Sequence, residues 1–171
     1  MLTPITDRAV ASGLNRSTAL VLVLALVLSF LHHADHVLRV DHSGWPFRQA
    51  VTPFTYSLLA YPVILFALLG PRSLFWLRWI LLAGAAGFVV FAHTMIEAPS
   101  VQFHMWAHNE SVHVSGVSNA LNVESAWLGY LAVAVGMALN VVAVVSAVMM
   151  LVAGLRGRAR TAHDEDVRGG R

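Results

Sequence analysis

Long apolar segments separated by short polar ones dominate the sequence of this 171-residue chain. Segments at about residues 18–38, 52–69, 74–97 and 125–155 are each long enough for a helix to cross the hydrocarbon core of a bilayer. The pattern therefore predicts an all-α fold, an integral membrane four-helix bundle. No internal repeat is evident in the sequence.

Local signals mark where these helices begin, bend and end. Asn15 is a candidate N-cap for the first span, and Thr52 followed by Pro53 is typical of a helix start for the second. Because proline lacks a backbone N–H and its ring obstructs the preceding turn, Pro62 is expected to kink the second span near its middle. Pro99 is expected to end the third span.

Small residues recur in the last two spans. In the third span they predict a surface for close contact with another helix, and they are Ala83, Gly84 and Gly87. In the fourth span they form a stripe with one member every four positions, made of Ala132, Gly136 and the polar Asn140. Asn140 is expected to make an interhelical hydrogen bond rather than to bind a ligand.

The one long connection is expected between the third and fourth spans. Within it, residues 102–113 predict a short amphipathic helix that lies at the membrane interface. The charged, glycine-containing segment 156–171 predicts a disordered cytoplasmic tail. Residues 1–155 are therefore expected to form a single transmembrane domain.

The composition also indicates a membrane protein. Hydrophobic residues make up 57% of the chain and charged residues 12%, and the mean hydropathy of +0.67 is far above that of an ordinary soluble domain. All 11 basic residues are arginine, which together with abundant alanine and valine suggests GC-rich, bacterial coding. The absence of cysteine excludes disulfides, thiolate metal ligands and iron–sulfur clusters.

The arginines predict the orientation of the chain. They flank the apolar spans instead of forming a stripe, which argues against a nucleic-acid partner and leaves the lipid bilayer as the expected surrounding. One side of the membrane would carry Arg8, Arg16, Arg72, Arg78, Arg156, Arg158, Arg160, Arg168 and Arg171, and the other only Arg39 and Arg48. The positive-inside rule then places both termini in the cytoplasm of a plasma (inner) membrane protein.

Histidines gather at the opposite, extracytoplasmic end of the predicted bundle. Those at this end are His32, His33, His36, His42, His93, His104, His108 and His113. Because residues four apart share one face of a helix, three pairs are candidate metal clips: His32 with His36, His93 with Glu97, and His104 with His108. His33 points about 100° away from the face of the first pair. Three such pairs on one side of a membrane predict a bound metal, since imidazole is the commonest metal ligand.

The expected metal ligands are His32, His36, His93, Glu97, His104 and His108. Glu97 is expected to act as a ligand or a general base, and Asp35 to bind the metal or to orient a ligating imidazole, so both are candidate catalytic residues. Asp35 could instead pair with Arg39 at i, i+4, a contact that needs no cofactor. Imidazole and carboxylate without thiolate suit a divalent transition metal, with zinc preferred, then iron, then copper.

Two of these segments resemble the histidine boxes of integral-membrane di-iron hydroxylases and desaturases. They are HHADH at residues 32–36 and HMWAH at residues 104–108. Those families carry more boxes, in another order of spacings, and place them on the cytoplasmic face. The resemblance covers these two segments alone, and the reaction of those families is not carried over.

Three functions are compatible with these expectations. The first is a metal-dependent membrane enzyme, an oxidoreductase or a hydrolase, that acts on a lipid-like or small apolar substrate. The second is an accessory, metal-handling or pH-sensing subunit without catalysis. The third is electron transfer through a quinone or through haem b held between two histidines, such as His36 and His93. A homo-oligomer or a subunit of a membrane complex would be compatible with each.

Overall fold

The computed structural model describes the backbone of residues 3–39 and 53–169, and the side chains of residues 5–39 and 54–159. All regular structure in these ranges is helical and none is strand, which confirms the all-α prediction. The elements are α1 (Thr3–Ala11), α2 (Arg16–Arg39), α3 (Pro53–Ser57), α4 (Ala60–Leu69), the 3-10 turn η1 (Arg72–Leu74), α5 (Phe75–Phe91), the π-helical turn η2 (Ala92–Ile96), α6 (Pro99–His108) and α7 (Ala126–Gly169). Of the residues named above, His42, Arg48, Thr52 and Arg171 lie outside the described backbone, and Pro53, Arg160 and Arg168 lie outside the described side chains.

Three helical stretches in the described part of the chain are long and apolar enough to cross a membrane. They are Arg16–Arg39, Arg72–Ile96 and Ala126–Ala159, and they coincide with the first, third and fourth expected spans. The second expected span corresponds to a shorter apolar stretch, Phe54–Leu69, which is divided into α3 and α4. The described chain therefore has three helices able to cross a bilayer, which indicates a helical membrane protein.

The break between α3 and α4 lies one turn before Pro62. A proline ring obstructs the carbonyl group four residues earlier, which is that of Leu58. The backbone turns more tightly at this point, because Leu59 N–H bonds to Tyr56 O at 3.0 Å and Tyr61 N–H bonds to Leu58 O at 3.2 Å. The kink expected from Pro62 is thus a complete interruption of the helix.

Of the first two helices, α2 begins where the sequence predicts, whereas α1 is not predicted. Asn15 caps α2 as predicted, since its side-chain oxygen accepts a hydrogen bond from Thr18 N–H at 2.8 Å. The hydropathy pattern does not predict α1, which lies beside α2 and α4 and buries Ala9 in the core. The sequence still carries signals for it, with Pro4 at its start and Gly13 just past its end, where φ is +94°.

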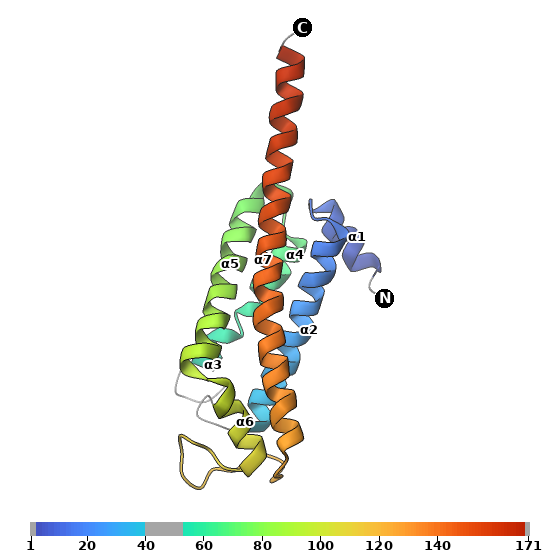
Figure 1. The fold of residues 1–171 in the computed structure, drawn as a ribbon. Helices are drawn as coiled ribbons and strands as arrows, with labels where there is room; N and C mark the ends of the chain where they lie inside the picture. Colours follow the sequence, from blue (N-terminus) through green and yellow to red (C-terminus); the bar gives the residue numbers. More distant parts are fainter. Residues whose placement is uncertain (1–2, 40–52, 170–171) are drawn as a thin grey trace.

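α7 is the central helix of the fold (Figure 1). It packs against α2, α5 and α6, and its Ala147 and Met150 contribute to a core that includes Leu22 and Leu68. Residues 156–169, where the sequence predicts a disordered tail, continue α7 as a helix that projects beyond the other helices. This segment contains no proline, so nothing in its sequence forces the helix to end at residue 155.

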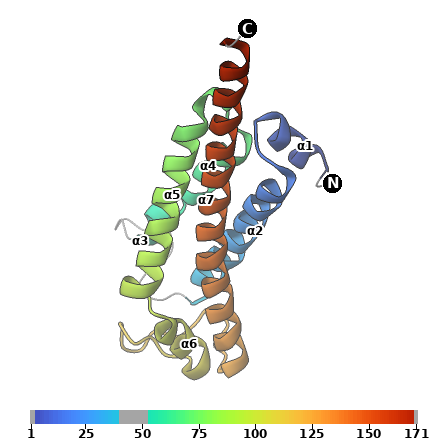
Figure 2. The same ribbon diagram turned by 45° about the horizontal axis from the view of Figure 1, so that its top comes forward.

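The two ends of the molecule carry different elements. α1, the turn between α4 and α5 and the C-terminal end of α7 lie at one end, and α6 lies at the other (Figures 1 and 2). α6 takes the place of the amphipathic helix predicted at 102–113, but it begins at Pro99 and ends at His108, before a left-handed Asn109 with φ of 52°. It buries Gln102 and Met105.

Small residues of α7 allow α6 to approach closely. A Cβ atom added at Gly129 would lie 3.0 Å from the backbone oxygen of Phe103, and one at Gly136 would lie 2.9 Å from the side-chain oxygen of Gln102. Ala132, between the two glycines, is buried. The predicted stripe on α7 is therefore a packing surface at Gly136, where its partner is α6.

The small residues of α5 do not form the predicted helix contact. A Cβ atom added at Gly84 or Gly87 would meet nothing within 4 Å, and both positions are exposed. Only Ala83 packs against the core. The prediction is wrong for the two glycines because no helix of the described chain covers this face of α5.

Matched glycine substitutions test the packing of α6 on α7. Gly129→Ala should lower the free energy of unfolding by about 1–3 kcal/mol, because the new methyl group meets the backbone of Phe103. Gly87→Ala should leave it unchanged or raise it by up to about 1 kcal/mol, since alanine favours a helix and nothing lies beside it. Thermal unfolding in detergent, followed by circular dichroism, compares the two variants, and equal midpoints would contradict the packing.

Candidate metal centre

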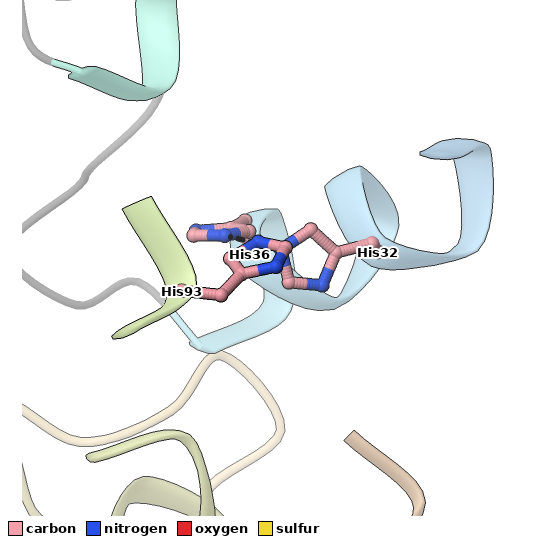
Figure 3. A group of neighbouring side chains, drawn as sticks. All are labelled: His32, His36 and His93. Atoms are coloured by element: carbon pink, nitrogen blue, oxygen red, sulfur yellow. Dashed lines mark hydrogen bonds between the residues drawn. The ribbon is translucent and has the colours of Figure 1, made fainter. Parts of the chain in front are cut away.

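Three histidines from two elements meet at one buried point. His32 and His36 lie one turn apart on α2, and His93 lies in η2 (Figure 3). Each offers a ring nitrogen, and these three nitrogens lie within 4.8 Å of one another. The ring centroids of His32 and His36 are 4.5 Å apart, and those of His32 and His93 are 4.4 Å apart. We refer to His32, His36 and His93 as the histidine cluster.

The π-helical turn η2 presents His93 to this cluster. The turn is closed by a hydrogen bond from Glu97 N–H to Ala92 O at 2.8 Å, which is an i→i+5 bond. A π turn inserts one residue into the helical repeat and therefore rotates the side chains within and after it. Both His93 and Glu97 reach the same site, but not as the α-helical clip that the sequence predicts.

The carboxylate of Glu97 adjoins the cluster. Its Oε2 lies 2.9 Å from Nε2 of His36, and the same nitrogen lies 3.0 Å from Nε2 of His32. A ring nitrogen of a neutral imidazole carries at most one hydrogen. One hydrogen can serve both contacts only as a shared and therefore weaker bond. A cation placed among these lone pairs would satisfy all three groups.

A buried ion-pair network holds Glu97 in place. Arg39 is fully buried and donates hydrogen bonds to Glu97 Oε1 and, from Nε at 2.7 Å, to Asp35 Oδ2. Asp35 Oδ1 accepts a hydrogen bond from the indole N–H of Trp106 at 2.7 Å. The network thus joins α2, the residue after η2, and α6. With the imidazoles neutral, two carboxylates and one guanidinium leave one excess negative charge at the site.

Asn140 of α7 orients His93. Its side-chain oxygen lies 2.8 Å from Nδ1 of His93 and can accept a hydrogen bond from it. An imidazole that donates from Nδ1 keeps the lone pair of Nε2 for a metal, which is the role of an orienting partner behind a metal ligand. The predicted interhelical hydrogen bond of Asn140 is therefore confirmed, and its partner is a member of the cluster. Nδ1 of His32, by contrast, is buried without a hydrogen-bond partner.

Asp35 makes the cofactor-free contact considered from the sequence. Its carboxylate oxygens bind Arg39 and Trp106, so the i, i+4 ion pair is present. In the described chain, these oxygens have no hydrogen bond to an imidazole, although the sequence indicates that Asp35 could orient a ligating histidine. Asp35 acts on the cluster through Arg39, which holds Glu97.

His33 belongs to a separate hydrogen-bond network. Its Nδ1 lies 2.7 Å from Ser29 O, and its Nε2 lies 2.7 Å from the hydroxyl of Ser57. The hydroxyl of Tyr61 lies 3.1 Å from Nδ1. This arrangement agrees with the expectation that His33 points away from the face of His32 and His36.

The predicted pair on α6 does not join the cluster. His104 and His108 lie beside each other, with ring centroids 4.6 Å apart, but the group of histidines within metal-binding distance in the described chain does not include them. α6 turns Gln102 and Met105 toward the bundle, which leaves His104 half-buried and His108 exposed. The convergence of three clips is therefore reduced to one cluster and one separate pair.

A cavity of about 60 Å³ adjoins the cluster. All three cluster histidines and Glu97 line it, together with apolar side chains that include Phe54 and Leu139. Since a single water needs roughly 10–15 Å³ of such space, the cavity has room for a few waters or one small molecule beside the ring nitrogens.

Arg39, Trp106 and Asn140 are the supporting residues that the sequence does not assign to the site. Asn140 is visible as a polar group within an apolar helix, which marks it as needing a buried partner. Arg39 is the last residue of α2, and its signal is the i, i+4 spacing to Asp35. Trp106 carries no such signal, because tryptophan is also expected as an interface anchor.

Comparisons with known proteins add no relative. No family model matches the chain, and neither does any curated protein or any solved structure. The function is therefore inferred from the geometry of this site.

Substitution of Arg39 tests the buried network. Arg39→Met should lower the free energy of unfolding by about 3–5 kcal/mol, because it leaves buried carboxylates without a counter-charge. Adding Glu97→Gln in the same chain should restore part of this loss. The exposed Arg16 provides the control, since Arg16→Met should change stability by less than about 0.5 kcal/mol. Chemical denaturation in detergent measures all three, and similar values for Arg39→Met and Arg16→Met would refute the network.

Proposed function

We propose that this chain is a multi-pass membrane protein that binds a divalent transition metal through His32, His36 and His93, with Glu97 beside it. We further propose that it uses this metal as an enzyme acting on a lipid-like or small apolar substrate. The observation that carries the proposal is the convergence of three buried ring nitrogens within 4.8 Å. Burying the polar ring nitrogens of imidazoles costs free energy unless each nitrogen has a partner, and one shared metal ion can bind all three rings.

The spacing of the ligands fits a metal ion. Two nitrogens bound to a tetrahedral zinc at about 2.0–2.1 Å lie about 3.3 Å apart. The Nε2 atoms of His32 and His36 are 3.0 Å apart, close to this spacing. All three ring nitrogens lie within 4.8 Å of one another, so the three rings would have to draw closer to share one ion. Three histidines, a neighbouring carboxylate and no thiolate favour zinc, with iron and copper as the next choices.

The charge of the site also favours a cation. Asp35 and Glu97 exceed Arg39 by one negative charge, and all three belong to one buried network. An unbalanced charge away from water is costly, and a bound divalent ion compensates it. The His104–His108 pair is left out of the proposed ligand set because it lies apart from the cluster.

The arrangement suits catalysis more than storage. Three protein ligands leave a position open on a metal, which is the pattern of catalytic rather than structural zinc sites. When bound, the metal would supply Lewis acidity toward a molecule in the adjoining cavity. Glu97 is placed to complete the ligand set or to accept a proton in that cavity, and Asp35 positions it through Arg39.

We propose that the chain crosses the membrane four times, with α3 and α4 together forming the second crossing. Both termini would then face the cytoplasm of the plasma membrane, as the arginine distribution indicates. This topology is supported by the position of three segments at the same end of the molecule: α1, the α4–α5 turn and the C-terminal end of α7 (Figure 1). The histidine cluster would lie toward the extracytoplasmic side.

A proton is the alternative occupant of the site. The same excess negative charge favours an imidazolium ion, which would make the protein a pH-sensing or accessory subunit without catalysis. Haem b fits less well, because a cavity of about 60 Å³ is far below the roughly 300–1,000 Å³ of sites for larger ligands.

Metal analysis tests the proposal directly. The purified wild-type protein, loaded with Zn²⁺ and dialysed, should retain about one ion per chain by elemental analysis. His32→Ala, His36→Ala and His93→Ala should each lose it, whereas His104→Ala and His108→Ala should keep it. A wild type that retains no zinc, iron or copper would exclude the metal site and leave the proton as the occupant.

Asn140 allows a finer test of the orienting bond. Asn140→Ala should weaken Zn²⁺ binding by about 10–100-fold, the usual effect of removing a partner behind a ligand. Asn140→Asp should restore the affinity, because its carboxylate also accepts a hydrogen bond from His93. Competition with a fluorescent chelator measures both affinities. Equal binding by the wild type and Asn140→Ala would show that the bond does not orient a ligand.

A further inference from the structure

A groove runs along the outer surface of the bundle between the α3–α4 stretch and α5. Its volume is about 590 Å³, which lies within the range of binding sites for organic ligands. Its walls include Leu59 and Ile80, which are 60% and 57% exposed. Its polar groups are the hydroxyls of Tyr56 and Ser57, and no charged side chain lines it. An apolar, uncharged wall selects hydrocarbon rather than a polar ligand.

The groove adjoins the cavity at the histidine cluster and is separated from it by shared side chains. Four residues line both spaces, namely Ser57, Ala60, Phe88 and Val89. A molecule in the groove would therefore lie against the side chains that border the cavity. Small motions of these side chains would connect the two spaces, because two of them are no larger than serine.

The groove lies across the middle of the membrane-crossing stretch of α5. Along α5 it extends from Ile80 to Val89, a rise of about 14 Å for a helix, and Gly84, the middle residue of the stretch Arg72–Ile96, lies within it. Its end at Tyr56 and Ser57 lies nearer the cluster. The lower half of a chain of the extracytoplasmic leaflet would thus lie in the groove and reach across the bilayer centre toward Ile80.

Gly84 helps to keep the groove open. It lines the groove, and a Cβ atom added there would meet nothing within 4 Å. Gly87, one turn away on the same helix, is equally unobstructed but does not line the groove. The two glycines therefore offer a test site and a matched control.

We infer that this groove binds the hydrocarbon chain of a membrane lipid from the extracytoplasmic leaflet and presents it to the cavity beside the histidine cluster. The inference rests on the proposed function for the role of the cluster, and it names a lipid chain as the substrate class. The lower half of the chain occupies the groove, and its mid-chain carbons lie against Phe88 and Val89.

Photolabelling with lipids tests this inference. The wild-type protein is placed in nanodiscs of phosphatidylcholine that contain a phosphatidylcholine with a diazirine in its acyl chain, either at mid-chain or at the terminal carbon. After irradiation, mass spectrometry locates the labelled residues. The mid-chain probe should label Ser57, Ala60, Phe88 and Val89, and the terminal probe should label Ile80 and its neighbours. Val141 and Val148, which are exposed on α7, report ordinary contact with bulk lipid.

Bulky substitutions supply the matched comparison. Gly84→Leu should reduce groove labelling, relative to that of Val141 and Val148, by roughly ten-fold. This fold-change corresponds to the usual free-energy cost of one overpacked contact. Gly87→Leu should leave this ratio unchanged. Ala85→Leu, which also fills the groove, serves as a second variant if Gly84→Leu does not fold. Wild-type labelling of the groove no stronger than that of α7, as when a helix of a second copy fills it, would overturn the inference.

Metal binding separates this inference from the proposed function. Labelling is measured on chelator-treated protein, and zinc binding is measured on the same variants, where Gly84→Leu should still retain the ion. Groove labelling without metal binding would reject only the metal site. Metal binding without groove labelling would reject only the lipid groove.

Discussion

The burial of charge at the end of α2 constrains the rest of the structure. Arg39 has no exposed surface and lies between Asp35 and Glu97, and Asp35 also binds Trp106. One set of contacts thus fixes α2, the residue after η2, and α6, which are the elements that carry or adjoin the histidine cluster. Since removing one partner of a buried ion pair costs several kcal/mol, the cluster keeps its shape only while these partners are in place.

Much of the fold follows from hydropathy and local signals. Apolar length predicts four spans, and three of them are helices able to cross a bilayer. Asn15 predicts the start of α2, and Pro62 predicts a kink where the structure has the break before α4. α1 escapes such reasoning because it is short and only weakly apolar, and its burial depends on the later packing of α2 and α4 against it. Hydropathy describes how well a segment suits water or lipid, whereas α1 is held by its packing against α2 and α4.

The site is predictable only within single helices. His32 and His36 share a face of α2 at a spacing that any α-helix imposes, so their pairing is visible in the sequence. Which residues complete the cluster depends on the rotation of each helix about its axis. The π turn of η2 sets the direction of His93, and the seating of α6 on small residues of α7 turns His104 away. Neither rotation has a signal in local spacing.

Glycine allows close helix packing on α7 but leaves an uncovered surface on α5. On α7, Gly129 and Gly136 let α6 approach, so the missing side chains are replaced by protein. On α5, no helix of the described chain covers Gly84, and the missing side chain leaves part of a groove. A hollow with apolar walls on a lipid-facing surface is unfavourable for water and loses dispersion contacts if left empty. Lipid hydrocarbon surrounds the protein at that depth. The face of α5 at Gly84, which no helix of the described chain covers, is therefore suited to bind a lipid chain next to the histidine cluster.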